Sequence, residues 1–563
     1  MRRYFLPVWV LLLSSLFAIN GPAWGQQVPV CSRDSTNPYI PDSDACVTGG
    51  FRFPVDSDFR DPATANNFSL SPPGARSLAM GGAFLGLADD ATAAYTNPAG
   101  LTNLAVGGSE VAVEIRGAQY TSSFADQGHF NSTPGLGTHV TDVGQDFIDG
   151  IQLGKADGNT TGLSFLSYGF VLPGGVTMAV YRHELGNFQS AFEAQGPFND
   201  DNCSTPAVIT GPNGELAYGQ PEGRECELFR VQPSRSSIDL EIVNWGASGA
   251  YAFDVGSESN LSVGLGFSYY EAAMNRSAET FDLCRFDQFD PMEPLDPNPN
   301  MDDPFFPGFP CTQSDARSRM PGGLYGPADY SPDNAFETTT EVANDTAFGI
   351  NLGFLWKIGR EQRISVGGVF RQGAEFDTVQ KIEIPPTRFN PAEPIETVGG
   401  SLTVPDVFGL GVAYRSTDGK TKLTFDWNRI LYSQTLGDFT RNLGQGCNVD
   451  MDPCPPEEVE DFSNSYTLDD IDQFHFGFER IVLVVESLFV GSARFGAWSE
   501  PDHTPRYTGN DDDLLALLGR EQDDELHLSV GFGLVIKEDY QLDFGANFSD
   551  VSDTYSFSLV KFF

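Results

Sequence analysis

The residues that could carry acid-base, metal or phosphate chemistry are not spaced as a catalytic site would need. His183-Glu184 lacks the second His of a zinc-binding helix, and Gly419-Lys420-Thr421 lacks the upstream glycine of a phosphate-binding loop. The sequence also contains no G-x-S-x-G nucleophile elbow. We therefore expect that the protein is not an enzyme, that it holds no metal and that it uses no cofactor.

The acidic residues of the chain point to solvated surfaces rather than to chemistry. Asp89-Asp90 suggests an acid pair, but adjacent carboxylates without a defined partner are more typical of a solvated turn. Further acidic residues are concentrated in the stretches 290–303, 450–461 and 511–513. None of these stretches has the carboxylate spacing and central glycine of a calcium loop, so we expect them to serve solubility, as in a saline habitat.

The charge balance excludes one class of partner. The chain carries 33 Lys and Arg residues against 77 Asp and Glu residues, which gives a formal net charge of −44. Nucleic acids and anionic surfaces need a basic face for their phosphates. The sequence therefore predicts no nucleic-acid partner.

The first 25 residues have the order of a secretory signal peptide. Arg2 and Arg3 precede an apolar run over 5–17, and Ala23-Trp24-Gly25 is a small-x-small cleavage site. The apolar run is too short for a membrane-spanning helix, and the rest of the chain has no run of about eighteen apolar residues. A mature chain that crosses a membrane must then do so as a closed barrel.

Eight cysteines follow this leader as four couples of close neighbours. The couples are Cys31 with Cys46, Cys203 with Cys226, Cys284 with Cys311, and Cys447 with Cys454. An even number of cysteines in a secreted chain predicts disulfides formed in an oxidising compartment. Metal binding is the weaker alternative, because no C-x-x-C spacing occurs and no His lies close to these couples.

Apolar residues alternate with polar or small residues in many short segments. Leu423, Phe425 and Trp427 lie on one face of such a segment, and the opposite face carries Lys422, Thr424, Asp426 and Asn428. The dry core between two sheets would not accept this charged face. A barrel with an apolar wall toward lipid and a polar lumen accepts it readily.

Fourteen segments of this kind follow residue 108. They are 109–122, 161–173, 175–186, 236–253, 259–275, 346–358, 363–379, 403–416, 421–433, 472–484, 487–499, 526–537, 540–549 and 554–563. Short turns follow the even-numbered segments, and long stretches follow most odd-numbered ones. The sequence therefore predicts an all-β, fourteen-stranded antiparallel transmembrane barrel over 109–563. Both chain ends would be periplasmic, and the long acidic loops would be extracellular.

Two local irregularities are expected in the wall. The apolar parity of the fourth segment changes near Val243, which predicts a β-bulge there. In the third segment, Gly186 could weaken strand pairing, or it could begin an ordinary loop.

A motif of small residues precedes the first strand, within an N-terminal region that we assign to 26–108. It consists of the stretches 74–84 (GARSLAMGGAF), 88–95 (ADDATAAY) and 97–101 (NPAGL). Pro98 fixes its own φ and favours an extended Asn97, whose side-chain amide can bond to neighbouring backbone. Asn97-Pro98 is therefore expected to form a stiff turn.

This motif resembles the N-terminal signature of the FadL/TodX-type outer-membrane transporters of long-chain fatty acids and other hydrophobic compounds. The resemblance implies a fourteen-stranded barrel whose N-terminal segment folds inward as a hatch. It also implies a gating role for Asn97, Pro98, Ala99 and Gly100, although these residues could simply turn the chain into strand one. In the family the barrel wall opens laterally at a kink in the third strand, which makes Gly186 the candidate for that opening here.

The resemblance implies a function and a location. We expect a monomer in the outer membrane of a Gram-negative bacterium, in contact with its lipids. Its expected function is the passive import of long-chain fatty acids or similar hydrophobic molecules. PorV-type proteins share the signature, so a component of protein secretion or envelope assembly is the alternative. That alternative predicts stable copurification with other envelope proteins.

Overall fold

The computed structural model describes most of the strand-rich part of the chain. The described residues are 72–104, 108–127, 152–195, 198–201, 207–210, 216–219, 227–230, 233–256, 258–281, 330, 335–383, 396–438, 465–485, 488–509 and 524–563. The expected signal peptide and all eight cysteines lie outside these residues. Within them, no helix has the length and apolar character needed to span a membrane.

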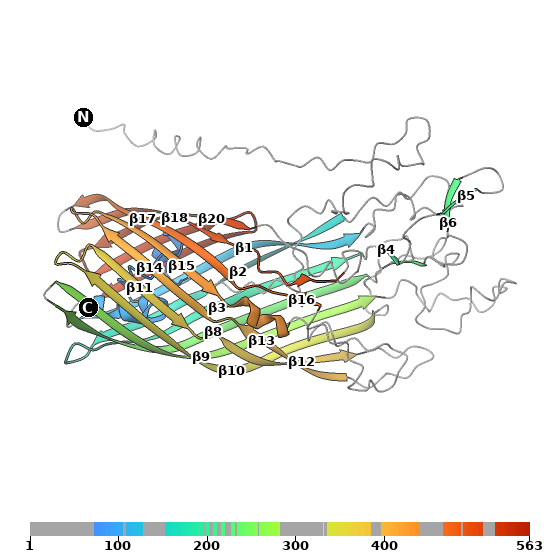
Figure 1. Ribbon diagram of the computed structural model, residues 1–563, viewed down its shortest axis with the longest axis horizontal. Coiled ribbons are helices and arrows are strands. Elements are labelled where there is room, and N and C mark those ends of the chain that lie inside the picture. Colours follow the sequence, from blue (N-terminus) through green and yellow to red (C-terminus); the bar gives the residue numbers. More distant parts are fainter. Residues whose placement is uncertain are drawn as a thin grey trace, which may run out of the picture. The chain divides into compact units, whose positions relative to one another are not determined.

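One antiparallel sheet dominates the molecule (Figure 1). Its strands are β1 (Ser109–Gln127), β2 (Gln152–Val171), β3 (Thr177–Ala194), β8 (Ser234–Val255), β9 (Ser259–Phe281), β10 (Ala335–Ile358), β11 (Ile364–Arg371), β12 (Ala374–Glu383), β13 (Glu396–Val404), β14 (Val407–Arg415), β15 (Thr421–Ile430), β17 (Ile471–Val485), β18 (Phe489–Glu500), β20 (Glu525–Ile536), β21 (Tyr540–Phe548) and β22 (Ser552–Phe562).

The sheet closes on itself into a fourteen-stranded barrel. The last strand, β22, pairs with β1, and β10 pairs with both β11 and β12. The sixteen segments make fourteen strands because β11 with β12, and β13 with β14, are halves of interrupted strands. The interruptions fall at Gln372-Gly373 and at Pro405-Asp406. Proline has no N–H to donate to a ladder, so the second break follows from the sequence. The predicted barrel and all fourteen predicted segments are confirmed.

Several strands run further than their alternation predicts. β3 continues to Ala194, and β10 begins at Ala335 rather than at 346. Gly186 is consequently inside a strand, and its interpretation as a loop start is wrong. Polar residues occupy both faces over Thr338–Glu341 of β10, so period-two alternation fades there. At the end of β3 the alternation is reversed, since Phe188 is buried and Gln189 is exposed.

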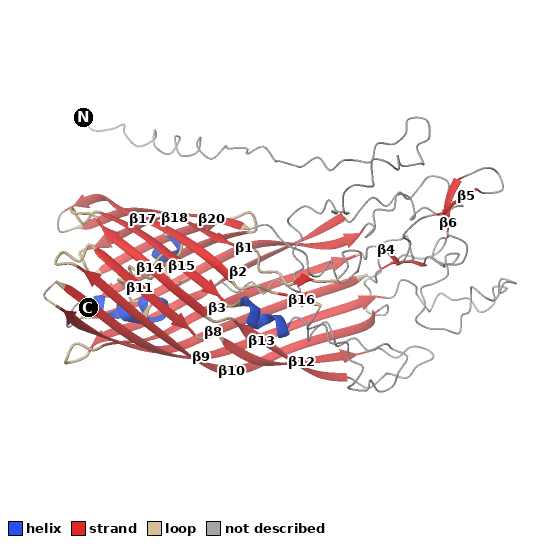
Figure 2. Ribbon diagram, viewed as in Figure 1, coloured by secondary structure: helices blue, strands red, loops and turns tan. Residues whose placement is uncertain are grey.

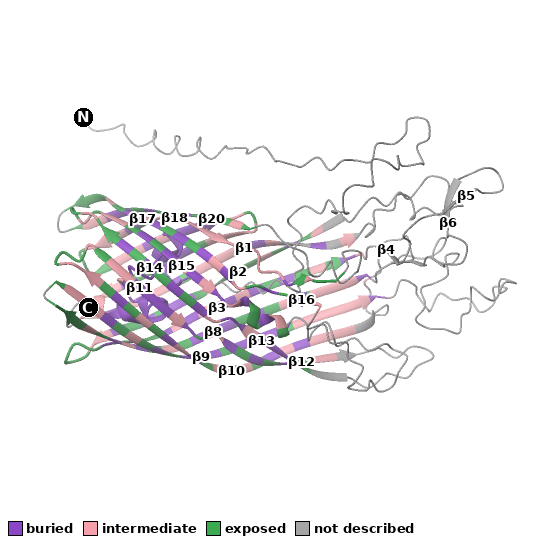
Figure 3. Ribbon diagram, viewed as in Figure 1, coloured by how far each residue is buried: buried purple, intermediate pink, exposed green. Residues whose placement is uncertain are grey.

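Exposed and buried residues alternate along the barrel strands (Figure 3), and many of the exposed ones are large apolar side chains, called the apolar band below. On β9 the band includes Val263, Leu265 and Phe267, each exposed. It ends at an aromatic level where the indole N–H of Trp245 donates to Glu271 over 3.0 Å. The inward face carries glycines and buried polar side chains instead.

The expected bulge is present, but on the neighbouring strand. The parity of β8 does change near Val243, where Ile242, Val243 and Asn244 are all buried. The ladder between β8 and β9 nevertheless runs without a shift, and the extra residue lies between Glu184 and Gly186 of β3. The change in the apolar pattern of β8 thus indicated an extra residue in its neighbour β3.

Smaller elements accompany the barrel. The two-stranded sheets are β4 (Phe198–Asp201) with β7 (Glu227–Arg230), β5 (Ala207–Thr210) with β6 (Leu216–Gly219), and β16 (Tyr466–Thr467) with β19 (Arg506–Tyr507). The β5–β6 hairpin belongs to a compact unit separate from the barrel. A 3₁₀ helix, η4 (Tyr432–Thr435), follows β15.

Candidate functional site

Residues 72–104, called the inner segment below, occupy the lumen. They form α2 (Ala75–Ala79), α3 (Ala93–Thr96) and the 3₁₀ helix η1 (Pro98–Asn103), joined by turns. Almost every residue of the segment is buried. Helix α2 contacts β18, β20, β21 and β22, whereas η1 contacts β3, β8, β9 and β10. Figure 2 shows these short helices in blue among the strands.

Pairs of wall glycines let the backbone of the inner segment approach the strands. Four pairs face each other in register: Gly264 with Gly353, Gly367 with Gly411, Gly477 with Gly496, and Gly531 with Gly545. A methyl group on Gly264 would collide with Pro98 and the amide of Ala99, and one on Gly353 would collide with the Asn97 side chain. The Asn97-Pro98-Ala99 turn therefore fits a notch that only glycine leaves open.

Asn97 fixes the turn through its side chain. Its amide nitrogen donates to the carbonyl oxygens of Leu85 and Phe354, 3.0 Å from each. Its amide oxygen accepts from the backbone N–H of Ala99 at 3.2 Å, which caps η1 with Pro98 in the first turn. Gly100 packs against Ala88 so closely that a Cβ there would collide with it. The structure thus brings all four predicted gate residues together against β9 and β10.

Wall carboxylates satisfy backbone donors that the inner segment leaves unpaired. The N–H of Gly74 donates to Glu114 at 2.7 Å, that of Leu85 to Asp426 at 2.7 Å, and that of Ala91 to Glu110 at 2.9 Å. The segment is rich in small residues and has few caps of its own. Its conformation is therefore defined by the barrel rather than by local propensity.

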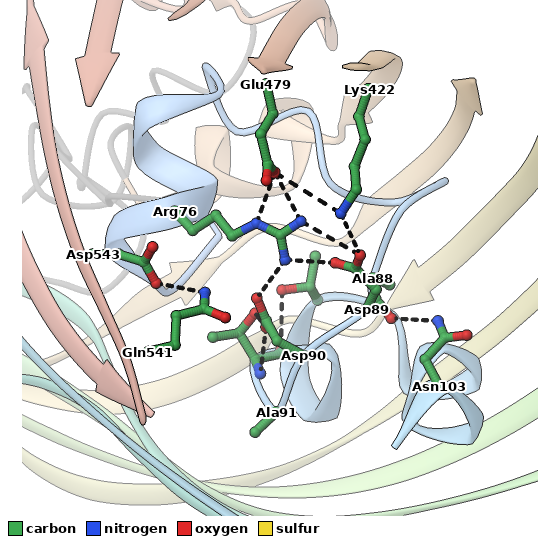
Figure 4. Close-up of polar contacts among 12 residues, drawn as sticks. Arg76, Ala88, Asp89, Asp90, Ala91, Asn103, Lys422, Glu479, Gln541 and Asp543 are labelled. Atoms are coloured by element: carbon green, nitrogen blue, oxygen red, sulfur yellow. Dashed lines mark hydrogen bonds and ion pairs between the residues drawn. The ribbon is translucent and has the colours of Figure 1, made fainter. Parts of the chain in front are cut away.

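Arg76 centres an ion network between the inner segment and the wall (Figure 4). Its guanidinium donates to Glu479 of β17 at 2.8 Å and to Asp89 at 2.6 Å. Lys422 of β15 lies 3.0 Å from the other oxygen of Asp89. A neighbouring pair, Arg494 with Asp543, connects β18 to β21 at 2.6 Å. The interpretation of Asp89-Asp90 as a solvated turn is therefore wrong.

Arg76 and Asp89 shift each other's pKa. Burial favours the neutral form of Asp89, but Arg76 and Lys422 outweigh it and hold the pKa of Asp89 well below its usual range. For Arg76 itself burial favours the neutral form, but Asp89, Glu479 and Asp90 together raise its pKa above its ordinary value.

A buried aromatic cluster lies beside the Asn97–Gly100 turn. The ring of Tyr95 is 4.3 Å from the His183 ring, and the Arg371 guanidinium is 5.0 Å from the Tyr95 ring centre. Neither ring nitrogen of His183 has a hydrogen-bond partner among the described residues, and the same holds for Nε and one Nη of Arg371. Phe165, Tyr181 and Tyr270 belong to the same apolar cluster. The unpartnered polar atoms inside this apolar cluster make it the candidate ligand site.

The wall ladder is interrupted above this cluster. β2 and β3 pair only between Phe165–Val171 and Thr177–His183. Beyond His183, within the described residues, β2 pairs with β1 alone and β3 with β8 alone. Side chains cross this seam instead: the Tyr120 hydroxyl bonds to the Gln189 backbone, and Arg182 donates to the Leu163 carbonyl. Gly186 lies at the bulge where the seam begins.

The residues considered for catalysis are not brought together. His183-Glu184 lies on β3 rather than on a helix, and Gly419 and Lys420 lie in the turn before β15. The paired glycines, Arg76 and Arg371 were missed at the sequence level. Only their lumen-facing parity in otherwise apolar strands could have indicated the glycines.

The fold and the inner segment together define a closed antiparallel barrel with N-terminal residues packed against the inward side of its strands. Comparison with protein-family models gives no match. No curated protein matches either. Among solved structures the chain is similar to a Pseudomonas aeruginosa FadL homologue, at 12% identity over 88% of this chain and 99% of that one, with a TM-score of 0.48. It is also similar to the Ralstonia pickettii toluene transporter TbuX, at 12% identity over 88% and 99%, with a TM-score of 0.45. A third similar structure is the CymD monoaromatic hydrocarbon channel, at 13% identity over the same shares, with a TM-score of 0.44.

Proposed function

We propose that the protein is an outer-membrane channel of the FadL/TodX type. It takes up long-chain fatty acids or other hydrophobic compounds by passive diffusion through a hatch-gated barrel. The apolar outward band of the barrel is the surface that lipid would cover. The inner segment is the hatch, and Asn97, Pro98, Ala99 and Gly100 form its gate.

The observation that carries the proposal is that the Tyr95 cluster directly adjoins the proposed gate residues in the chain. Tyr95 precedes Asn97 by two residues, and its ring packs against both His183 and Arg371. A ligand that enters this cluster must displace Tyr95 or pack on it. Ligand binding and the position of the gate are coupled through that one side chain.

The cluster favours an amphiphile over a plain hydrocarbon. Arg371 is 6% exposed and makes no ion pair within the described residues. A buried cation without a counter-charge is costly, and the carboxylate of a fatty acid would remove that cost. The acyl chain then adds about 0.8 kcal/mol for each CH₂ that it buries. A long-chain fatty acid therefore matches both parts of the site.

The seam between β2 and β3 is the lateral exit in this proposal. Tyr120 of β1 reaches past β2 to the β3 backbone, and Arg182 of β3 bonds to the β2 backbone; both side chains can change rotamer without breaking a ladder. Gly186 lies where the two strands separate. A ligand released from the Tyr95 cluster would leave the barrel between these strands.

Uptake of labelled oleate by cells that carry the gene tests the proposed function. We expect oleate uptake above that of cells without the gene and slower uptake by Asn97→Ala. In a variant that lacks 72–104, we expect oleate uptake that no longer depends on the gate residues. Uptake equal to that of empty cells contradicts transport. Normal uptake by Asn97→Ala would contradict the gating role and leave transport in place.

A further inference from the structure

A second interruption lies on the opposite side of the Tyr95 cluster, between β10 and the seventh strand of the barrel. The seventh strand consists of β11 and β12. β10 pairs with β12 over Thr338–Ala343 and with β11 over Asn351–Ile358. The seven residues 344–350 between these ladders have no ladder partner on this edge. The same is true of the six residues 372–377 of the seventh strand. Among the described contacts, two hydrogen bonds cross the interval, at its two ends.

The first of these bonds lies at the inner end of the interval. The N–H of Gln372 donates to the Ile350 carbonyl at 2.9 Å. At the other end, the N–H of Asp377 donates to the Asp345 carboxylate at 2.8 Å. A side chain thus replaces the ladder where the strands meet again. A rotamer change of Asp345 would break this hydrogen bond and separate the two strands at this end of the interval.

The seventh strand passes inward at this break. A Cβ on Gly349, which faces the lumen, would lie 3.0 Å from the Gln372 carbonyl oxygen and 3.3 Å from that of Gly373. The Tyr270 hydroxyl donates to the same Gln372 carbonyl at 3.1 Å. On its far side, Gly373 is held by Asp406, to which its N–H donates at 2.7 Å. The kink is therefore fixed from both sides.

The two mouths of the break have matching chemistry. The inner mouth adjoins the aromatic cluster, because Arg371 directly precedes Gln372 and Tyr270 belongs to the cluster. The outer mouth lies next to Phe348, which is 77% exposed and packs on Tyr269 at a ring distance of 5.3 Å. An apolar chain would meet aromatic carbon at both ends of the passage.

We infer that this break is a second lateral path, through which a hydrocarbon chain held at the Tyr95 cluster passes between the lumen and the bilayer. The inference rests on the proposed function and extends it. The barrel then has two exits from one binding cluster, at the β2–β3 seam and at the β10–β12 break. The ligand class of the second path is a long acyl chain with a carboxylate head group, which Arg371 holds until the molecule passes through the break.

A disulfide across the break tests this path in cells that carry the full chain. Asn344→Cys with Asp377→Cys extends the register one residue beyond the Ala343–Thr378 pair. Val342→Cys with Val379→Cys is the matched control, because that pair already lies in an intact ladder. We expect the oxidised Asn344–Asp377 variant to take up labelled oleate more slowly than the oxidised control, and reduction to restore it.

Two further outcomes separate this inference from the proposed function. Equal uptake by both oxidised variants contradicts the second path alone, whereas no uptake by the unmodified protein contradicts transport itself. If the double variant does not fold, a photoreactive fatty acid bound to the unmodified protein gives the answer. Labelling of 344–350 supports the path, and labelling confined to the β2–β3 seam overturns it.

Discussion

The side-chain amide of Asn97 donates to the carbonyl oxygen of Phe354, 3.0 Å away, and so ties the turn before Pro98 to strand β10. Asn97→Asp keeps the shape and the oxygen that caps η1 but removes both N–H donors. Leaving two buried carbonyls opposite a carboxylate should cost about 2 kcal/mol. We expect an Ala99→Cys reporter to react faster with a maleimide when it is combined with Asn97→Asp. An unchanged labelling rate would show that this amide does not hold the gate.

The glycine notch makes a second prediction. Gly264→Ala places a methyl group against Pro98 and Ala99, and overpacking of this kind costs about 2 kcal/mol. We expect the gate residues to be displaced and the same maleimide reporter to react faster. Gly249→Ala is the matched control, because a Cβ there meets only the Thr177 carbonyl at 3.8 Å. Equal behaviour of the two alanine variants would contradict the notch.

The two adjacent aspartates should respond oppositely to neutralisation. The lowered pKa of Asp89 means that its ionised form stabilises the fold above its unfolded pKa, and this is lost only as the pH falls through the lower folded pKa. Asp89→Asn should therefore destabilise the protein at pH 7 by about 3 kcal/mol, because Arg76 and Lys422 lose their partner.

Burial raises the pKa of Asp90, so its contribution is present at low pH and is lost as the pH rises through the folded pKa. Asp90→Asn retains the oxygen that accepts from the Thr92 N–H and should be neutral or stabilising at pH 7. Thermal unfolding followed by circular dichroism between pH 3 and pH 8 measures both variants. Equal losses in the two would contradict the assigned network.

Arg371 should determine the preference for an anionic head group. Arg371→Gln removes the charge at similar size, and a lost charge-assisted hydrogen bond is worth about 2 kcal/mol, or roughly thirtyfold in affinity. Equilibrium binding of oleate to the purified protein should weaken by that amount, with oleyl alcohol as the uncharged control. An equal loss for both ligands would mean that the residue supports packing rather than charge recognition.

Sequence patterns predicted the wall well and the contacts inside it poorly. Strands such as 421–433 could be located because one face meets an apolar surrounding and the other a polar lumen, which imposes period two. The ends of β3 and β10 were missed because the outward face is no longer apolar there. Gly264 and Gly353 carry only a lumen-facing parity as a local signal, since their role depends on a register between strands. Asp89 resembled a surface residue because its partners, Arg76 and Lys422, are distant in sequence.

The most direct test of the central claim is oleate uptake with the gate fastened to the wall. Thr102 and Ser262 have hydroxyl oxygens 2.7 Å apart, so cysteines at both positions are within reach of a disulfide. Each single cysteine variant is the matched control. A gated hatch predicts that the oxidised double variant stops taking up labelled oleate and that reduction restores uptake. Undiminished uptake with the disulfide formed would contradict a movement of the gate during transport.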